Sequence, residues 1–399
     1  MTSSTTQPFR DGYGVRDGHG VRDGHGVQGP PTRAWVPWSD AWQEALYGEG
    51  GFYRSAAGPA GSFATSAQGI PLAGEVLAGA VLTLMRREGL SSFVDFACGR
   101  GELVTQMHRL APDLSCVGVD VVPRPPGLPD QIGWVQSKGG AAVPDDLGVS
   151  PGAGGVLVLA NEWLDVVPCT VAEIDDHSVA RIVLVQPDTG AELLGDPLDD
   201  TDLQWCQRYW PPGRMSPGNR IEVGRPRDEA WRALVAAVCR APERGRALVV
   251  AVDYGHTAPT RPAGGTLTGF RDGLQVPPTP DGSSDLTAHV AIDALGTDEL
   301  VDQRTQLQRL GVRGTLPVHA LSRTQPATYL QGLARSGAEC ALLARGGLGD
   351  FVWAIRRLPA TGPADAAGPA SPAGPAGPAG PAGPGGVDPA GLVSSGLHG

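Results

Sequence analysis

Two aspartates and a glycine-rich turn form the part of the sequence best suited to chemistry. Asp95 lies near the end of an apolar run, and Ala97, Gly99 and Gly101 follow it within the segment FVDFACGRG. Nineteen residues after that segment, a second apolar run ends at Asp120. Glycines let a backbone turn closely beside a ligand, and a carboxylate can accept hydrogen bonds from two ribose hydroxyls. The pattern predicts a nucleotide-type cofactor site at the edge of a parallel sheet.

The details of this turn distinguish between cofactors. A dinucleotide fingerprint needs a third glycine, but Val104 stands at that position. An acid before the turn, the small-x-Gly-x-Gly turn and an acid on the next strand resemble the S-adenosylmethionine site of class I methyltransferases. In that resemblance Asp120 binds the ribose, and Asp95 reaches the amino end of the methionine moiety, directly or through water. The alternative is an ordinary strand, turn and helix with a surface aspartate, and the two acids favour the cofactor.

Two residues in or after later apolar runs are further candidates for the cofactor. Trp134 lies in the run 132–136, where an adenine ring needs an apolar wall, although its indole could equally belong to the core. Asn161 follows the run 155–160 and either contacts the cofactor or caps the next helix. In open α/β sheets, ligands bind beyond the carboxyl ends of the strands, which is where Asn161 is expected.

The same edge of the predicted sheet offers groups for a transfer reaction. Glu162 is the first candidate acid because it closely follows a strand, and Asp165 is the second. Carboxylates that bind two nitrogens of a guanidinium leave the third nitrogen more nucleophilic. His289 or His256 could accept the proton that is released after attack. The alternatives are a solvated helix position for Asp165, structural hydrogen bonds for either histidine, and a loop-orienting role for Asp253.

Apolar runs alternate with helical patterns along the middle of the chain, which is typical of a parallel, doubly wound α/β sheet. A helical part is expected over 35–47, an amphipathic helix over 72–87 and a hairpin over 167–187. The stretch 257–295 is rich in glycine, proline and threonine, and long loops of this kind are usually functional. The predicted strands are 92–97, 115–120, 132–136, 155–160, 247–253, 338–343 and 350–357.

Composition divides the chain into one folded region between two tails. Residues 1–33 contain the tandem repeats RDGYGV, RDGHGV and RDGHGV, and residues 359–399 are dominated by alanine, glycine and proline. Neither segment offers an apolar face to bury, so both are expected to be disordered. We therefore expect one domain at 34–358, with insertions at 167–215 and 257–320.

Charge and cysteine usage narrow the class of partner and the compartment. The 31 basic and 42 acidic residues give a net charge of −11, which argues against nucleic acid as the main partner. The six cysteines form no C-x-x-C pair and the histidines form no H-x-x-x-H pair, so no metal site is expected. The sequence has no apolar run long enough to span a membrane and no secretory signal. These features fit a cytoplasmic protein, and they leave its oligomeric state open.

Six ordered motifs within residues 45–357 resemble the MidA family. They are GSFATS, FVDFACGRG, NEWLDVVP, VDYGH, GTL and SSDLTAHV. The family includes a mitochondrial arginine methyltransferase needed for assembly of respiratory complex I. The resemblance implies a Rossmann-like class I methyltransferase sheet, a helical N-terminal segment, and an inserted hairpin and loop region that recognises substrate. It also implies S-adenosylmethionine as cofactor and, in the mitochondrial member, a protein arginine as substrate.

The chain departs from the family pattern on both sides of the predicted site. Asp95 and Ala97 stand where glutamate and glycine are usual. Ser62 and Ala291 stand where the family commonly has aspartates. These last two changes remove carboxylates from the expected substrate side, so they concern the methyl acceptor more than the cofactor.

Three functions are compatible with the sequence. The first is an S-adenosylmethionine-dependent methyltransferase of a protein side chain, with an arginine nitrogen as first guess and a wide acidic groove beside Glu162. The second is a small-molecule methyltransferase with a closed apolar pocket, roofed by the segments 34–75 and 257–295. The third is a non-catalytic assembly or partner-binding factor, which ranks last because Asp95 and Asp120 are both present.

Overall fold

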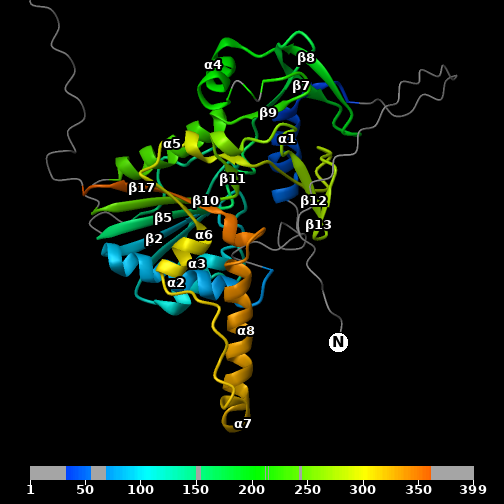
Figure 1. Cartoon of the computed structure of the whole chain (residues 1–399). Helices are drawn as coiled ribbons and strands as arrows, with labels where there is room; N and C mark the ends of the chain where they lie inside the picture. Colours follow the sequence, from blue (N-terminus) through cyan, green and yellow to red (C-terminus); the bar gives the residue numbers. More distant parts are fainter. Residues whose placement is uncertain are drawn as a thin grey trace, which may run out of the picture.

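The structure is a computed structural model that describes residues 33–54, 69–149, 154–211, 213, 215–241 and 245–360. It has a three-layer α/β body with a smaller β-rich lobe beside it (Figure 1). Both predicted tails, except for Arg33 and residues 359–360, lie outside the described residues. So does the GSFATS motif with Ser62.

A seven-stranded sheet forms the centre of the body. Its strands are β2 (Leu90–Phe96), β3 (Ser115–Asp120), β4 (Gly133–Gln136), β5 (Gly155–Asn161), β10 (Ala247–Asp253), β16 (Glu299–Asp302) and β17 (Val352–Leu358). The strands follow the order β16-β17-β10-β5-β2-β3-β4. The five strands from β10 to β4 are parallel to one another, β17 pairs antiparallel with β10, and β16 pairs antiparallel with β17. This confirms the α/β class, and the order reverses between β2 and β5, where a crevice forms at the carboxyl ends.

Helices cover both faces of this sheet because its strands are apolar at successive positions. In β2, Phe93 belongs to the core on one face and Val94 to the core on the other. One helical layer covers the first face and α5 covers the second (Figure 1). The first layer consists of α2 (Ala73–Glu88), α3 (Glu102–Leu110), α6 (Gln303–Arg309) and the end of α8 (Pro326–Leu342), and α5 spans Arg225–Arg240.

The prediction of a strand at 338–343 is wrong. These residues lie in the last turns of α8 and just beyond its end. Ala338 and Leu342, four residues apart, point to the same face of the helix and are both buried in the core. A short apolar run does not by itself distinguish a strand from a buried helical turn. The additional strand at this edge of the sheet is instead β16.

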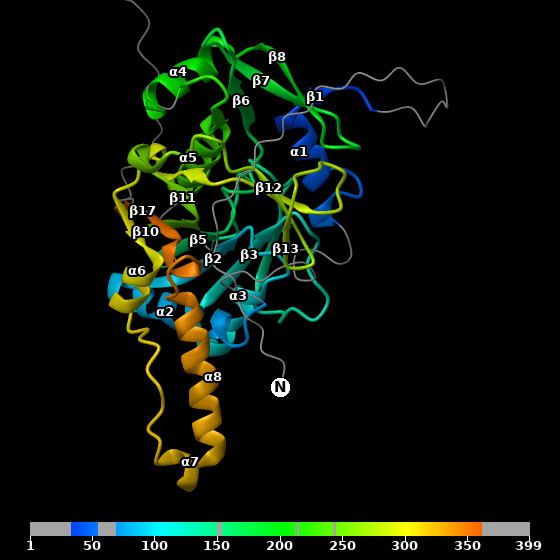
Figure 2. The same ribbon diagram turned by 45° about the vertical axis from the view of Figure 1, so that its right-hand side comes forward.

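The predicted hairpin exists, and it belongs to a second sheet. Strands β6 (Thr170–Ile174) and β7 (Ala180–Val185) pair antiparallel, as predicted for 167–187. Around them lie β1 (Val36–Pro37), β8 (Glu192–Pro197), β9 (Arg220–Val223) and α4 (Asp200–Tyr209). Helix α1 (Trp38–Tyr47), followed by the short helix η1 (Phe52–Arg54), packs against this sheet with its tryptophans buried. This lobe stands over the carboxyl ends of the central strands (Figure 2).

The stretch 257–295 is built from short elements instead of one irregular loop. It contains a three-stranded sheet in the order β13-β12-β14, and β15 pairs with β11, which lies just before the stretch. Beyond it, α7 (Leu321–Thr324) and most of α8 project from the body as an arm (Figure 2). None of the helices within the described residues is long and apolar enough to cross a membrane. The short elements are β11 (Gly255–His256), η4 (Ala258–Thr260), β12 (Thr268–Arg271), β13 (Leu274–Val276), β14 (Asp285–Thr287), β15 (Val290–Ala291), η5 (Ile292–Ala294) and, before β17, η6 (Leu348–Asp350).

Candidate active site

A cavity of about 1340 Å³ lies at the carboxyl ends of β2, β3, β5 and β10. Tyr47 from α1 and Tyr53 from η1 contribute to its wall, and residues between Thr260 and Pro278 also line it. Two predicted site residues, Gly101 and Trp134, are not part of the lining. The other eight line the cavity: Asp95, Ala97, Gly99, Asp120, Asn161, Glu162, Asp165 and His289.

The glycine-rich turn adopts a left-handed backbone at three positions. The φ angle is 57° at Ala97, 62° at Gly99 and 83° at Gly101. Glycine enters this region freely, whereas a residue with a Cβ does so at a cost, so Ala97 is held in a strained conformation beside the cavity. Gly101 is the N-cap of α3. The turn therefore brings the main chain of residues 97–99 to the cavity with little side-chain bulk.

Backbone amides fix both acids of this motif. The Val104 N–H donates to Asp95 Oδ2 at 3.0 Å. Asp120 accepts from the Gly99 N–H on Oδ2 at 2.7 Å and from the Val122 N–H on Oδ1 at 3.2 Å. A carboxylate has about four acceptor positions, so Asp120 retains acceptor capacity for a ligand beside the amides of Gly99, Val121 and Val122. Burial raises the pKa of Asp120 to about 6 and holds the pKa of Asp95 well above its ordinary value.

The other two predicted cofactor residues have different surroundings. Trp134 donates from Nε1 to the Val122 carbonyl at 3.1 Å, and its ring packs beneath the turn beside Gly101 and Gly118. This location favours the packing role over contact with an adenine ring. Asn161 lines the cavity, and the residues that follow it form turns instead of a helix, so it caps no helix there.

A second group of acids lines the same cavity. The Thr287 hydroxyl donates to Asp165 Oδ2 at 2.7 Å, and the Tyr53 hydroxyl donates to Asp285 Oδ1 at 2.8 Å. Burial, and then the charge of Asp165, hold the pKa of Asp285 well above its ordinary value. Neighbouring carboxylates repel one another when ionised, and a cation between them relieves that repulsion. This group of acids therefore favours a cationic ligand.

Asp165 lies in a buried position beside Thr287. Its side chain is buried, and Oδ1 has no hydrogen-bond partner among the described residues. Oδ2 already accepts the Thr287 proton, so the Tyr254 hydroxyl must be the donor in its own short contact with Thr287. An unpaired buried acceptor is costly to maintain. The predicted alternative, a solvated helix position for Asp165, is wrong.

Glu162 directly follows the carboxyl end of β5 and has a strained backbone conformation. Its φ angle is 54°, and its N–H donates to the Val252 carbonyl at 2.8 Å. The Asn161 amide donates to Glu162 Oε1 at 3.0 Å. A left-handed φ in a residue with a long side chain persists only where the surroundings impose it, and such residues concentrate at functional sites.

Asp253 lies where it can orient a loop, which is the predicted alternative to a catalytic role for this residue. It is fully buried, and its Oδ2 accepts the N–H groups of Leu164 at 2.8 Å and Asp165 at 3.3 Å. Burial, followed by the charges of Asp165 and Glu162, holds its pKa well above the ordinary value. Asp253 thus sets the path of the segment that carries Asp165.

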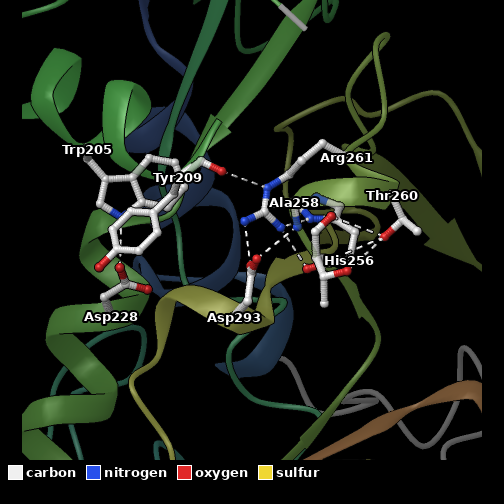
Figure 3. A network of polar contacts seen from close by, with 9 residues as sticks. Trp205, Tyr209, Asp228, His256, Ala258, Thr260, Arg261 and Asp293 are labelled. Atoms are coloured by element: carbon white, nitrogen blue, oxygen red, sulfur yellow. Dashed lines mark hydrogen bonds and ion pairs between the residues drawn. The ribbon is translucent and has the colours of Figure 1, made fainter. Parts of the chain in front are cut away.

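The two candidate histidines differ in what surrounds their rings. Arg261 Nη1 lies 2.8 Å from His256 Nδ1, as Figure 3 shows. Since a guanidinium only donates, Nδ1 must be the acceptor, and the proton of this ring is on Nε2. Burial, followed by the charge of Arg261, lowers the pKa of His256 to about 3. His256 is therefore fixed as a neutral structural residue, which leaves His289 as the candidate proton acceptor.

Arg261 also ties the start of the 260–278 segment to the rest of the fold. Its guanidinium pairs with Asp293 at 2.5 Å and donates to the Tyr209 carbonyl at 3.2 Å (Figure 3). His289 is held from another side, since its N–H donates to the Thr266 hydroxyl at 2.9 Å. Burial lowers the pKa of His289, while Glu222 and Asp165 act in the opposite direction.

Arg227 is a positioning residue that the sequence did not reveal. It lies in α5, is 1% exposed, and donates to four backbone carbonyls at 2.8–3.0 Å. Those carbonyls belong to Asp165 and Val167 in one segment, and to Ala288 and His289 in another. One buried cation thus fastens together the two segments that carry the candidate catalytic residues. Tyr53, Tyr254 and Asp285 also line the cavity and are not predicted by the sequence, although Tyr254 and Asp285 lie within the motifs VDYGH and SSDLTAHV.

A family comparison identifies the chemistry that this geometry serves. The sequence model of the family described as "Putative S-adenosyl-L-methionine-dependent methyltransferase" matches residues 104–312, more than half of the chain. The protein belongs to this family. The methyltransferase therefore uses S-adenosylmethionine as its cofactor. Among curated proteins, no match to the sequence was found.

Two crystal structures of Burkholderia thailandensis proteins resemble the methyltransferase. One, described as a "likely methyl transferase" and bound to S-adenosyl-homocysteine, is 23% identical with a TM-score of 0.57, over 80% of this chain and 87% of that one. The other, a native structure, is 23% identical with a TM-score of 0.56, over 83% of this chain and 90% of that one. These likenesses establish the class I fold.

The residues of the cavity fit the cofactor. The turn at Ala97 and Gly99 carries little side-chain bulk, as close approach of a ligand requires. The remaining acceptor capacity of Asp120 suits ribose hydroxyls. Glu162, Asp165 and Asp285 line another part of the same cavity.

Proposed function

We propose that the methyltransferase transfers a methyl group to a nitrogen of a protein side chain, with arginine as the first candidate. The observation that carries the proposal is the acidic group of Glu162, Asp165 and Asp285 in one cavity. A guanidinium presents five N–H donors in a planar fork, which suits paired carboxylate oxygens better than it suits a neutral surface. The six sequence motifs from GSFATS to SSDLTAHV also support membership of the MidA subfamily.

The residues of the cavity would position and activate such an acceptor. The cofactor supplies an electrophilic methyl group bound to a positively charged sulfur. Asp165 Oδ1 and the Glu162 carboxylate would accept N–H groups of two guanidinium nitrogens, which concentrates positive charge there and leaves the third nitrogen more nucleophilic. Holding that nitrogen near the methyl group and in line with the breaking bond supplies most of the rate enhancement. His289 would take up the released proton.

A second candidate acceptor is a small molecule. The observation in its favour is the roof of the cavity, since Tyr47, Tyr53 and residues between Thr260 and Pro278 line it as that hypothesis requires. We also propose that the reaction takes place in the cytoplasm. The cysteines of the described residues are all free, which fits a reducing compartment.

Labelling in a lysate tests this proposal. Lysate from a strain that lacks the protein is incubated with the purified enzyme and S-adenosylmethionine labelled in its methyl group. We expect label in one or more protein bands, and methylarginine after their hydrolysis. Enzyme with Asp120→Ala serves as the control that lacks cofactor binding. Label confined to low-molecular-weight material would reject the protein acceptor and support the small molecule.

The Glu162→Gln variant tests the acceptor side separately from the cofactor. We expect it to bind S-adenosylmethionine like the wild type and to lose about 10²-fold or more in transfer, because an amide cannot provide the charge that orients a guanidinium. Calorimetry gives the affinity, and label incorporation gives the rate. Glu44→Gln, an exposed glutamate in α1, is the matched control. Wild-type transfer by Glu162→Gln would remove this carboxylate from the reaction.

A further inference from the structure

The N-terminal repeat supplies arginines in a regular pattern. Arg10, Arg16 and Arg22 recur every six residues, and each is followed by aspartate and glycine. The residue before each arginine is phenylalanine or valine, and the glycine lies two residues after it. The C-terminal segment beyond residue 360 contains no arginine or lysine, so this pattern is specific to one end of the chain.

The repeat precedes Arg33, from which the chain leads to a wall of the cavity. Arg33, the first described residue, donates its N–H to Asp188 at 3.1 Å, and its carbonyl accepts from Gln186 at 3.5 Å. Five residues later, α1 begins at Trp38, and it ends at Tyr47, which lines the cavity. The chain therefore leads from the repeat to the site with only this short helix between them.

Covalent geometry allows the repeat to reach the cavity. Five extended residues and α1 place Arg33 within about 31 Å of Tyr47, at about 3.4 Å and 1.5 Å per residue respectively. The eleven residues from Arg22 to Arg33 can span at most about 37 Å, and the segments to Arg16 and Arg10 are longer. A tethered group within reach has an effective concentration of about the millimolar order.

Charge complementarity identifies what the cavity would recognise in the repeat. Asp165, Asp285 and Glu162 form an acidic group, and Asp165 Oδ1 is an unpaired acceptor among the described residues. Guanidinium groups are the cations that the repeat carries, since Lys138 is the only lysine of the chain. An arginine side chain is therefore the part of the repeat that the acids can bind.

We propose that the methyltransferase methylates its own N-terminal repeat, at Arg10, Arg16 or Arg22 of the same chain. The inference rests on the proposed function and names a substrate for it. A guanidinium nitrogen forms the bond to the methyl carbon, and the carbon–sulfur bond breaks with its electron pair moving to sulfur. One N–H proton of that nitrogen leaves to His289 and then to water, which restores the nitrogen lone pair and yields S-adenosylhomocysteine.

Self-methylation is tested with the full-length protein and no other acceptor. The purified protein is incubated with methyl-labelled S-adenosylmethionine, digested and analysed by mass spectrometry for residues 1–33. We expect methylarginine in the repeat, with incorporation per chain unchanged on dilution. The triple variant R10K/R16K/R22K is expected to lose this label, and so is Asp120→Ala. The triple variant R86K/R323K/R345K changes three exposed arginines elsewhere and is expected to keep it.

Other outcomes separate this inference from the proposed function. An unlabelled repeat, together with methylarginine in lysate proteins, would overturn self-methylation and leave the proposed function standing. An unlabelled repeat with label only in small molecules would overturn both. Incorporation that falls in proportion to dilution would reject transfer within one chain.

Discussion

Replacing Asp120 with alanine is expected to weaken S-adenosylmethionine binding by about a hundredfold or more. Two hydrogen bonds to a charged acceptor contribute about 1.5–3 kcal/mol each, and every 1.4 kcal/mol is about a factor of ten in affinity. The variant also removes the acceptor that holds the amides of Gly99 and Val122, so the turn loses its orientation. Titration calorimetry of the purified variant gives the affinity directly.

Two control variants make this expectation specific. Asp113→Ala removes an exposed aspartate that precedes the same strand, and it should bind the cofactor like the wild type. Asp120→Asn keeps the shape of the side chain and one acceptor oxygen, and should lose less affinity than alanine. Equal affinity in the wild type and Asp120→Ala would sink the assignment of the ribose contact.

The pH dependence of cofactor binding offers a further check on Asp120. Burial raises the pKa of its carboxyl to about 6. A ligand that requires the ionised carboxylate therefore binds fully above that pH and loses affinity as the pH falls through it. At pH 5 the ionised fraction is about one in eleven, so affinity should fall roughly tenfold from its value at pH 8. The Asp120→Asn variant should show no such fall, because the amide does not titrate.

Replacing Arg227 is expected to abolish most methyl transfer while leaving the cofactor bound. Its guanidinium is the shared anchor of the segments that carry Asp165 and His289. A misplacement of about 1 Å at reacting groups can cost about 10²-fold in rate. Arg227→Lys keeps the charge but lacks the planar fork that reaches four carbonyls, so we expect at least that loss. Label incorporation gives the rate, and calorimetry gives the cofactor affinity.

A stability measurement separates positioning from a collapse of the fold. Arg227→Ala leaves buried carbonyls unpaired, and the free energy of unfolding should fall by about 3 kcal/mol or more. Arg227→Lys should lose less stability, which makes it the variant that decides the question. Arg232→Lys, an exposed arginine in the same helix, is the matched control. Wild-type transfer by Arg227→Lys would show that the four contacts do not position the site.

The cofactor end of the site was predictable because its signals are local. Asp95 and the turn from Ala97 to Gly101 lie within a few residues of one another, and Asp120 lies one helix further along. Strand periodicity, glycine spacing and strand-end acids are short-range properties of the chain. The same short-range signals predicted the parallel sheet and the hairpin at 170–185.

The short-range signals were not sufficient where an apolar run is brief or its role depends on its neighbours. Residues 338–342 belong to a brief apolar run, and they are helical because Ala338 and Leu342 pack on the core from a continuous helix. Trp134 has an aromatic ring that could pack against an adenine. It lies beneath the turn instead, because Gly101 and Gly118 leave room for it there. In both cases packing against distant residues chose between two local possibilities.

The sequence by itself determined the cofactor class. Each residue of the glycine-rich motif has its position fixed by a neighbouring turn or strand, so a local pattern is enough to predict it. Only the tertiary structure decided how the acceptor end is built. Asp165 meets Thr287 across 122 residues of sequence, and Tyr53 meets Asp285 across 232. Arg227 joins two segments that lie about 60 residues before and after it in the sequence. It does so through their backbone carbonyls, which every residue type has, so the residue types of these segments do not indicate the contact. Contacts of this kind depend on how the whole chain packs, so no local pattern predicts them.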